Sequence, residues 1–137
     1  MEEFDGGTSL RNHLKFDLNE AIEILERTPK VLNSLLGGLS DVWTHQNEGE
    51  DTWSPFDVLG HLIHGENTDW LVRIRLILSE FDETFEPFDR FAQFQNSKGK
   101  SMSHMLRAFE ELRIINLAEL KSFNITEEQL KEKIQQE

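Results

Sequence analysis

The sequence predicts an all-α fold built from long packed helices. Apolar side chains recur at three- and four-residue steps through most of the 137 residues, which is the spacing of one face of a helix. Alternating runs rich in Val, Ile and Thr, which are typical of strands, do not occur. The chain has three prolines, eight glycines and no internal repeat, so one helical domain over residues 1–137 is expected.

The first predicted helix spans about residues 10–36. Thr28-Pro29 interrupts its apolar stripe, and because Thr caps helices well and Pro suits the first helical position, a kink or restart is expected there. Gly37-Gly38 predicts the end of the helix. Residues 44–52 are mostly polar and predict a loop.

The second predicted helix spans residues 54–79 and has the clearest start. Ser54 would be the N-cap, Pro55 the first helical residue, and Asp57 would complement the free amides of the first turn. Apolar residues occupy much of its circumference, which is typical of a helix at the centre of a fold.

The remaining elements are a Phe-rich segment, a third long helix and a short final one. Residues 80–94 predict an ordered loop, and residues 97–100 a turn. Ser101 or Ser103 would cap the third helix, and residues 126–129 form a capping-box pattern before a short helix. That last helix offers only Leu130 and Ile134 to a core. An antiparallel bundle closes best with four full-length helices, and only three long ones are predicted. Either the stretch at residues 10–36 forms two packing helices, or one helix of the bundle is missing from this chain.

Composition excludes several function classes. With 14 basic and 26 acidic residues the net charge is −12, which argues against binding nucleic acid or an anionic membrane surface. No apolar run is long enough to span a bilayer, and the acidic N-terminus is not a signal peptide. The absence of Cys excludes disulfides and a Cys nucleophile. A cytoplasmic location is therefore expected.

Two histidines on the second helix could carry chemistry. His61 and His64 are three residues apart, so their rings lie on neighbouring ridges and could supply two metal ligands. A catalytic metal usually needs three protein groups. The alternative is structural, with His61 a hydrogen-bonded core residue and His64 a surface one.

Other polar residues of this region have structural interpretations. Glu66 and Arg73 are two turns apart, so a buried ion pair is favoured over a role for Glu66 as acid, base or support of a metal ligand. Ser54 has no general base at a recognisable spacing and is explained as a cap. By default, all three Trp residues line a core or a groove.

The run WSPFDVLGHL at residues 53–62 is followed by Glu66, Trp70 and residues 73–75. Together these residues carry a resemblance to the DinB-like (DinB/YfiT) superfamily. The resemblance returns at residues 113–120 and 126–130, so it covers about residues 15–133. Each motif is short, and their shared order and spacing make the match specific.

The resemblance implies an up-down four-helix bundle of DinB/YfiT type with a divalent metal, zinc or nickel, in its groove. His61 matches one of three typical His ligands. The other two, at i and i+4 on the last helix, have no counterpart here, so that helix is expected to be missing or supplied by another chain. Trp53, His64, Glu66 and Trp70 are candidates to line the groove or support the ligands.

Two functions follow from this resemblance. The first is a metal-dependent enzyme, a hydrolase or a transferase that uses a low-molecular-weight thiol, acting on a small molecule. Its catalytic residues are not identified, its metal site would be incomplete, and the 137-residue form would be inactive. The second is a non-catalytic bundle that uses the same scaffold for binding or assembly. A missing helix would expose apolar surface, so a homo-oligomer, in the simplest case a dimer, is expected.

Overall fold

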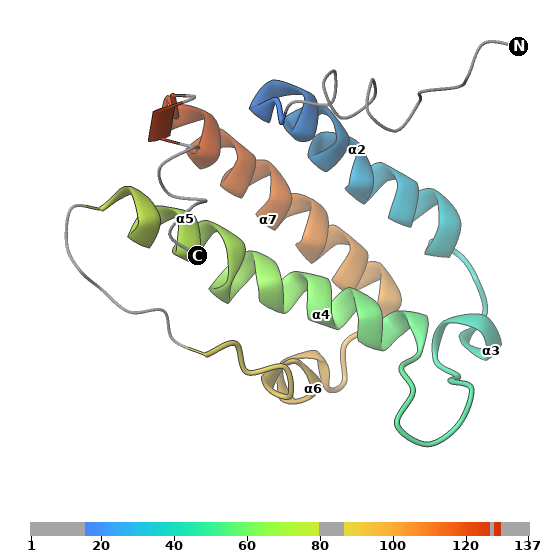
Figure 1. Ribbon diagram of the computed structural model, residues 1–137. Coiled ribbons are helices and arrows are strands. Elements are labelled where there is room, and N and C mark those ends of the chain that lie inside the picture. Colours follow the sequence, from blue (N-terminus) through green and yellow to red (C-terminus); the bar gives the residue numbers. More distant parts are fainter. Residues whose placement is uncertain (1–15, 80–86, 127, 130–137) are drawn as a thin grey trace, which may run out of the picture.

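The computed structural model describes residues 16–79, 87–126 and 128–129, and its regular elements there are all helices. Figure 1 shows the long ones side by side. They are α2 (Leu18–Leu36), α4 (Pro55–Thr68) continued by α5 (Trp70–Leu78), and α7 (Met102–Ser122). Because α7 packs against both α2 and α4, it joins the bundle together. The prediction of an all-α fold is confirmed.

Helix α2 begins later than predicted and is not interrupted. Asp17 caps it, and the Asp17 carboxylate accepts hydrogen bonds from the amides of Asn19 and Glu20 at 2.9 and 3.2 Å. Of the kink or restart predicted at Thr28-Pro29, the restart is wrong, because a single helix runs through a buried Pro29. Pro29 cannot donate to the carbonyl of Leu25 one turn earlier. The guanidinium of Arg113 donates to that carbonyl instead, at 2.9 Å.

Helix α4 starts as the sequence predicts. The Ser54 hydroxyl accepts from the Asp57 amide at 3.1 Å, and the Asp57 carboxylate accepts from the Ser54 amide at 3.0 Å. This reciprocal capping box leaves Ser54 only 4% exposed. Pro55 takes the first helical position, where its missing N–H costs nothing.

The predicted continuous helix to residue 79 is interrupted at Asp69, between α4 and α5. Asp69 has φ −117° and ψ −86°, outside the helical region. In an unbroken helix the carbonyl of Glu66 would accept from the amide of residue 70. Here Asn116 Nδ2 donates to that carbonyl at 2.9 Å. A side chain of α7 thus occupies a carbonyl at the point where the helix is interrupted.

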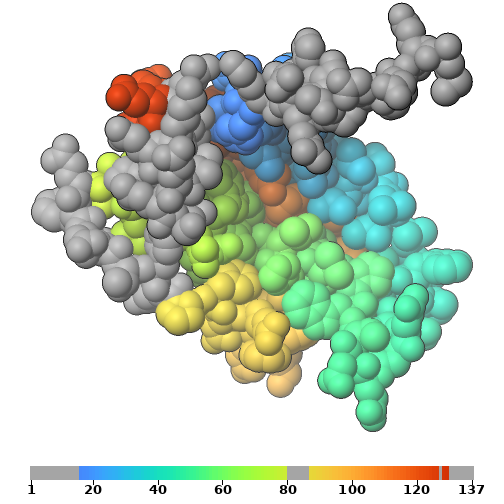
Figure 2. Space-filling view, in the orientation of Figure 1, coloured from blue at the N-terminus to red at the C-terminus, as the bar shows by residue number. Residues whose placement is uncertain are grey.

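Two short helices were not predicted. Helix α3 (Asp41–Thr44) follows α2, and Thr44, expected in a polar loop, is fully buried. Helix α6 (Ala92–Ser97) arises at the end of the Phe-rich segment and lies against α4, as its yellow side chains beside the green ones show in Figure 2. Residues 80–86 of that segment lie outside the described residues.

The third long helix and the final capping pattern agree with the sequence. Ser101 caps α7, since its hydroxyl accepts from the His104 amide at 3.1 Å. Thr126 and Gln129 exchange the expected capping-box hydrogen bonds at 3.0 and 3.2 Å. Leu130 and Ile134, the apolar residues of the predicted last helix, lie outside the described residues.

The core consists of two apolar clusters separated by a polar layer. One cluster contains Leu36, Leu59, Met102, Met105, Leu106 and Phe109. The other contains Ile22, Leu71, Leu117 and Leu120. Between them along α4 and α7 lie the buried residues Glu66, Arg113 and Asn116. None of the described helices is long and apolar enough to cross a membrane.

Candidate functional site

His61 lies on α4 within a cluster of aromatic rings. Its ring centroid is 5.2 Å from that of Trp53 and 5.3 Å from that of Phe88. Phe88 also contacts His64, with centroids 4.8 Å apart, and Trp53 packs edge-on against Phe94 at 5.8 Å. The cluster therefore joins the start of α4 to the segment around α6.

The Nδ1 atom of His61 is buried and has no hydrogen-bond partner. A buried polar atom that remains unpaired costs about 1–3 kcal/mol, so such atoms call for an explanation. A neutral imidazole nitrogen with a free lone pair is a ligand for a divalent metal. On this observation His61 fits the role of one metal ligand.

The described residues do not supply the rest of a metal site. Within residues 16–79, 87–126 and 128–129, no three His, Cys, Asp or Glu side chains are grouped so that they could hold an ion. His45 stacks on Phe56 at 4.6 Å, and His104 is exposed at the start of α7. A catalytic zinc needs about three protein ligands. These residues thus fit one ligand and not a complete site.

Two placements expected in the structural alternative for the histidines are wrong. His64, expected at the surface, is only 8% exposed, and His61, expected to be hydrogen-bonded, has its unpaired Nδ1. The cause is the packing of Phe88 over both rings.

Glu66 belongs to a separate buried network. Its Oε1 accepts from Arg113 Nε at 2.6 Å, its Oε2 accepts from Trp70 Nε1, and both members of the ion pair are nearly buried. The predicted buried Glu–Arg pair exists, but its partner is Arg113. Arg73 pairs with Asp69 at 2.7 Å on the surface instead.

The three tryptophans have different environments. Trp53 packs on His61, and Trp70 binds Glu66 and packs against the Leu71 cluster. Trp43 is 68% exposed, so the expectation that it lines a core or groove is wrong. It lies on the four-residue helix α3, where only Thr44 is buried.

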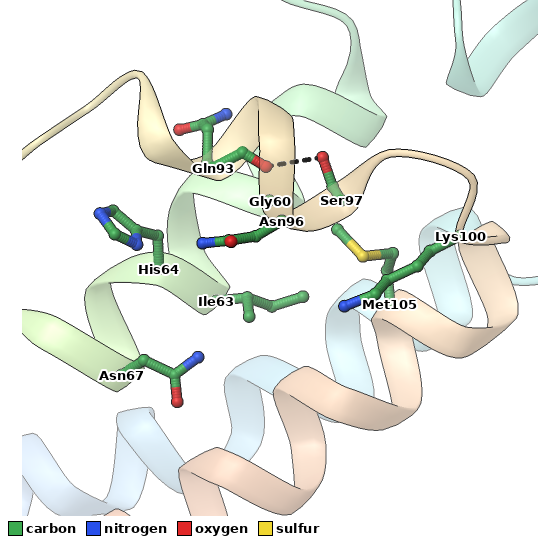
Figure 3. A pocket seen from close by; sticks show the side chains of 9 residues that line it. All are labelled: Gly60, Ile63, His64, Asn67, Gln93, Asn96, Ser97, Lys100 and Met105. Carbon is green, nitrogen blue, oxygen red and sulfur yellow. Dashed lines mark hydrogen bonds between the residues drawn. The ribbon is translucent and has the colours of Figure 1, made fainter.

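A polar cavity of about 330 Å³ lies beside the aromatic cluster, between α4, α6 and the start of α7 (Figure 3). Its lining consists of Gly60, Ile63, His64, Asn67, Gln93, Asn96, Ser97, Lys100 and Met105. Among these only His64 was singled out from the sequence. The others belong to no motif, and they come together because the unpredicted helix α6 packs on α4.

Gly60 and Gln93 hold α6 in place. A Cβ at Gly60 would lie 3.5 Å from Met105 Cε and 3.7 Å from Gln93 Nε2, within ordinary van der Waals contact, so α6 and α7 both pack next to this position. Gln93 Nε2 donates to the carbonyl of Asp57 at 2.7 Å, and Gln93 is 1% exposed. Its Oε1 is buried without a hydrogen-bond partner.

Comparison with known proteins places these features in a family. A model of the DinB superfamily matches residues 24–137. The chain belongs to the DinB superfamily. Among solved structures, this DinB-superfamily chain is similar to YfiT from Bacillus subtilis, described as a probable metal-dependent hydrolase with an unusual four-helix bundle topology. A search of curated proteins found no match.

The similarity to YfiT extends over most of this chain. The TM-score is 0.67 and the sequence identity 24%, over 81% of this chain and 63% of YfiT. The chain thus spans less than two thirds of the length of YfiT. At this identity the likeness shows a shared fold.

Proposed function

We propose that this DinB-superfamily chain serves a divalent-metal-dependent enzyme and that His61 is one ligand of its metal. The observation that carries the proposal is the buried, unpaired Nδ1 of His61. Membership of the superfamily and the likeness to a protein described as a probable metal-dependent hydrolase support it. Because the described residues hold no further grouped ligands, the remaining ligands are proposed to come from outside them.

The aromatic rings of Trp53 and Phe88 are proposed to hold the His61 imidazole in place. Trp53 and Phe88 pack on the imidazole and restrict its rotation, so the ligand is preorganised. They also exclude water from one side of the ring. A bound divalent metal would lower the pKa of a water or thiol and so supply a nucleophile near neutral pH.

The reaction class is proposed as hydrolysis of a small molecule, in line with the description of YfiT. A transferase that uses a low-molecular-weight thiol is the second possibility within this class. The chain has no Cys, so the thiol would have to be a free cosubstrate. The lack of Cys also fits a reducing compartment, and a cytoplasmic location is part of the proposal.

The test is zinc binding by the full gene product that carries this chain, measured by isothermal titration calorimetry. His61→Ala should weaken binding at least about tenfold, since outright loss of a ligand exceeds the 10–100-fold effect of losing a ligand's supporting hydrogen bond. His104→Ala is the matched control, because His104 is exposed on another helix. Equal affinity for wild type and His61→Ala would defeat the proposal.

A second candidate function is assembly without catalysis. Ile24, Val31 and Leu35 lie on one face of α2 and are 70%, 60% and 63% exposed. An apolar stripe of this kind is typical of an interaction surface, and here we propose a homodimer. Sedimentation should show a concentration-dependent dimer that Val31→Lys disrupts. A monomer at all concentrations would rule this candidate out.

A further inference from the structure

The cavity beside α6 has the size and wall chemistry of a small-ligand site. Its volume of about 330 Å³ lies at the lower end of the roughly 300–1,000 Å³ typical of ligand pockets. Three elements supply its walls, with Asn67 from α4, Asn96 from α6 and Met105 from α7. The pocket is therefore set by tertiary packing and not by one loop.

Several polar side chains of the lining, three of them exposed to solvent, have no partner among the described residues. Asn67, Asn96, His64 and Lys100 make no side-chain hydrogen bond or ion pair with any other described residue. In Figure 3 the Asn96 amide lies above Ile63, the Lys100 ammonium group ends beside it, the Asn67 amide lies below it, and the His64 ring lies at the other side of Asn96. Each of the four can donate hydrogen bonds to a ligand.

The described lining of the cavity differs in charge from the chain as a whole. The protein carries a net charge of −12, yet none of the described Asp or Glu residues lines this pocket, and Lys100 gives it positive charge. The nearby carboxylates are engaged elsewhere, Asp57 with the Ser54 amide and Glu66 with Arg113.

We propose that this pocket binds a small oxyanion, a carboxylate or phosphate group of a metabolite-sized compound. The Lys100 ammonium group forms the ion pair, and the Asn67 and Asn96 amides donate to the remaining oxygens. His64 lines the same pocket and shares the Phe88 ring with His61. Anion binding itself does not require the metal site.

The test is a two-dimensional NMR titration in metal-free buffer at constant ionic strength. The probes are inorganic phosphate and acetate, with chloride as the reference salt. Amide signals of residues 60–67 and 93–100 should shift with saturation. Saturation by phosphate alone assigns a phosphate-bearing ligand, and saturation by acetate assigns a carboxylate. If neither anion shifts these signals more than chloride does, the proposal is wrong.

Single substitutions distinguish specific anion binding in the pocket from general attraction of anions to positive surface charge. Lys100→Gln should weaken anion binding about tenfold, because a charge-assisted hydrogen bond is lost. Lys98→Gln removes the same charge two residues away but outside the lining, and should leave binding unchanged. Asn67→Ala should weaken binding while the circular dichroism spectrum stays that of wild type. Equal losses for Lys98→Gln and Lys100→Gln would overturn the proposal.

His61→Ala distinguishes this inference from the proposed function. His61 does not line the pocket, so anion binding should survive its loss. Zinc binding should weaken at least about tenfold. Each proposal can therefore fail while the other stands.

Discussion

Arg113 donates to the carbonyl of Leu25 at 2.9 Å, and this is the carbonyl that Pro29 leaves without its helical partner. The same guanidinium donates through Nε to Glu66 at 2.6 Å and lies 4.8 Å from the centre of the Phe109 ring. One side chain of α7 thus completes α2 and pairs with α4. The polar layer between the two apolar clusters depends on it.

Removing Arg113 should be strongly destabilising. Arg113→Met leaves the buried Glu66 carboxylate without its cation, and loss of one member of a buried pair costs about 3–5 kcal/mol. Urea denaturation should show this as a lower free energy of unfolding. Arg75→Met is the control, because Arg75 pairs with Glu119 on the surface, where about 0–1 kcal/mol is expected.

The double variant Glu66→Leu with Arg113→Met gives a further check. With both charges removed, much of the lost stability should return. If Arg113→Met alone costs no more than Arg75→Met, the polar layer does not have the role described here.

The capping box of α4 should also be measurable. Ser54→Ala removes the hydroxyl that accepts from the Asp57 amide, at an expected cost of about 0.5–2 kcal/mol. Ser40→Ala is the matched control, since Ser40 precedes α3 without a side-chain capping hydrogen bond. Thermal unfolding should separate the two, and a Ser54→Ala protein as stable as Ser40→Ala would contradict the assignment.

Two glycines should respond to alanine in opposite directions. Gly65 lies inside α4, and a Cβ there would meet nothing within 4 Å, so Gly65→Ala should stabilise by about 0.5–1 kcal/mol. Gly38 has φ +80°, where a side chain is strained, so Gly38→Ala should destabilise by about 1 kcal/mol. Chemical denaturation measures both, and a destabilised Gly65→Ala protein would show that α4 is packed more tightly there.

The contact between α2 and α7 predicts a pH dependence. Lys121 Nζ donates to Glu26 at 2.6 Å, and this hydrogen bond, with the charge of Lys121, lowers the pKa of Glu26 from its ordinary value of 4.5. The pair therefore stabilises the fold fully above that ordinary value, and the contribution is lost as pH falls through the lowered pKa.

Carboxyl NMR titration measures this effect directly. Lys121→Met should raise the pKa of Glu26, and Lys30→Met should raise it less, since Lys30 is the weakest of its cationic neighbours. An unchanged pKa in Lys121→Met would contradict the contact.

Local signals in the sequence were sufficient for the helix starts and the fold class. Helices α4 and α7 are capped by Ser54 and Ser101 through hydrogen bonds within the first turn. Residues that are neighbours in the sequence make these contacts, so the helix starts can be predicted from the sequence. The continuity at Pro29 and the interruption at Asp69 both depend on side chains of α7, Arg113 and Asn116. Contacts so distant in the chain leave no local pattern.

Only part of the candidate site could likewise be predicted from the sequence. The motif around His61, together with the order and spacing of the motifs that follow it, was sufficient to identify the family. The pocket depends on the packing of α6 near Gly60, and α6 has only six residues, too few to give a clear helical pattern in the sequence. A buried ion pair of Glu66 with an arginine was predicted, but the arginine was taken to be Arg73. The partner is Arg113 on α7, which spacing within α4 and α5 cannot identify.

The most direct test of the central claim is ¹⁵N NMR of the histidine rings of the full gene product during titration with Zn²⁺. The account predicts that the ring nitrogens of His61 shift on binding, while those of His45 and His104 keep their positions. A His61 ring that does not respond to zinc, or that responds no more than His104, would contradict it.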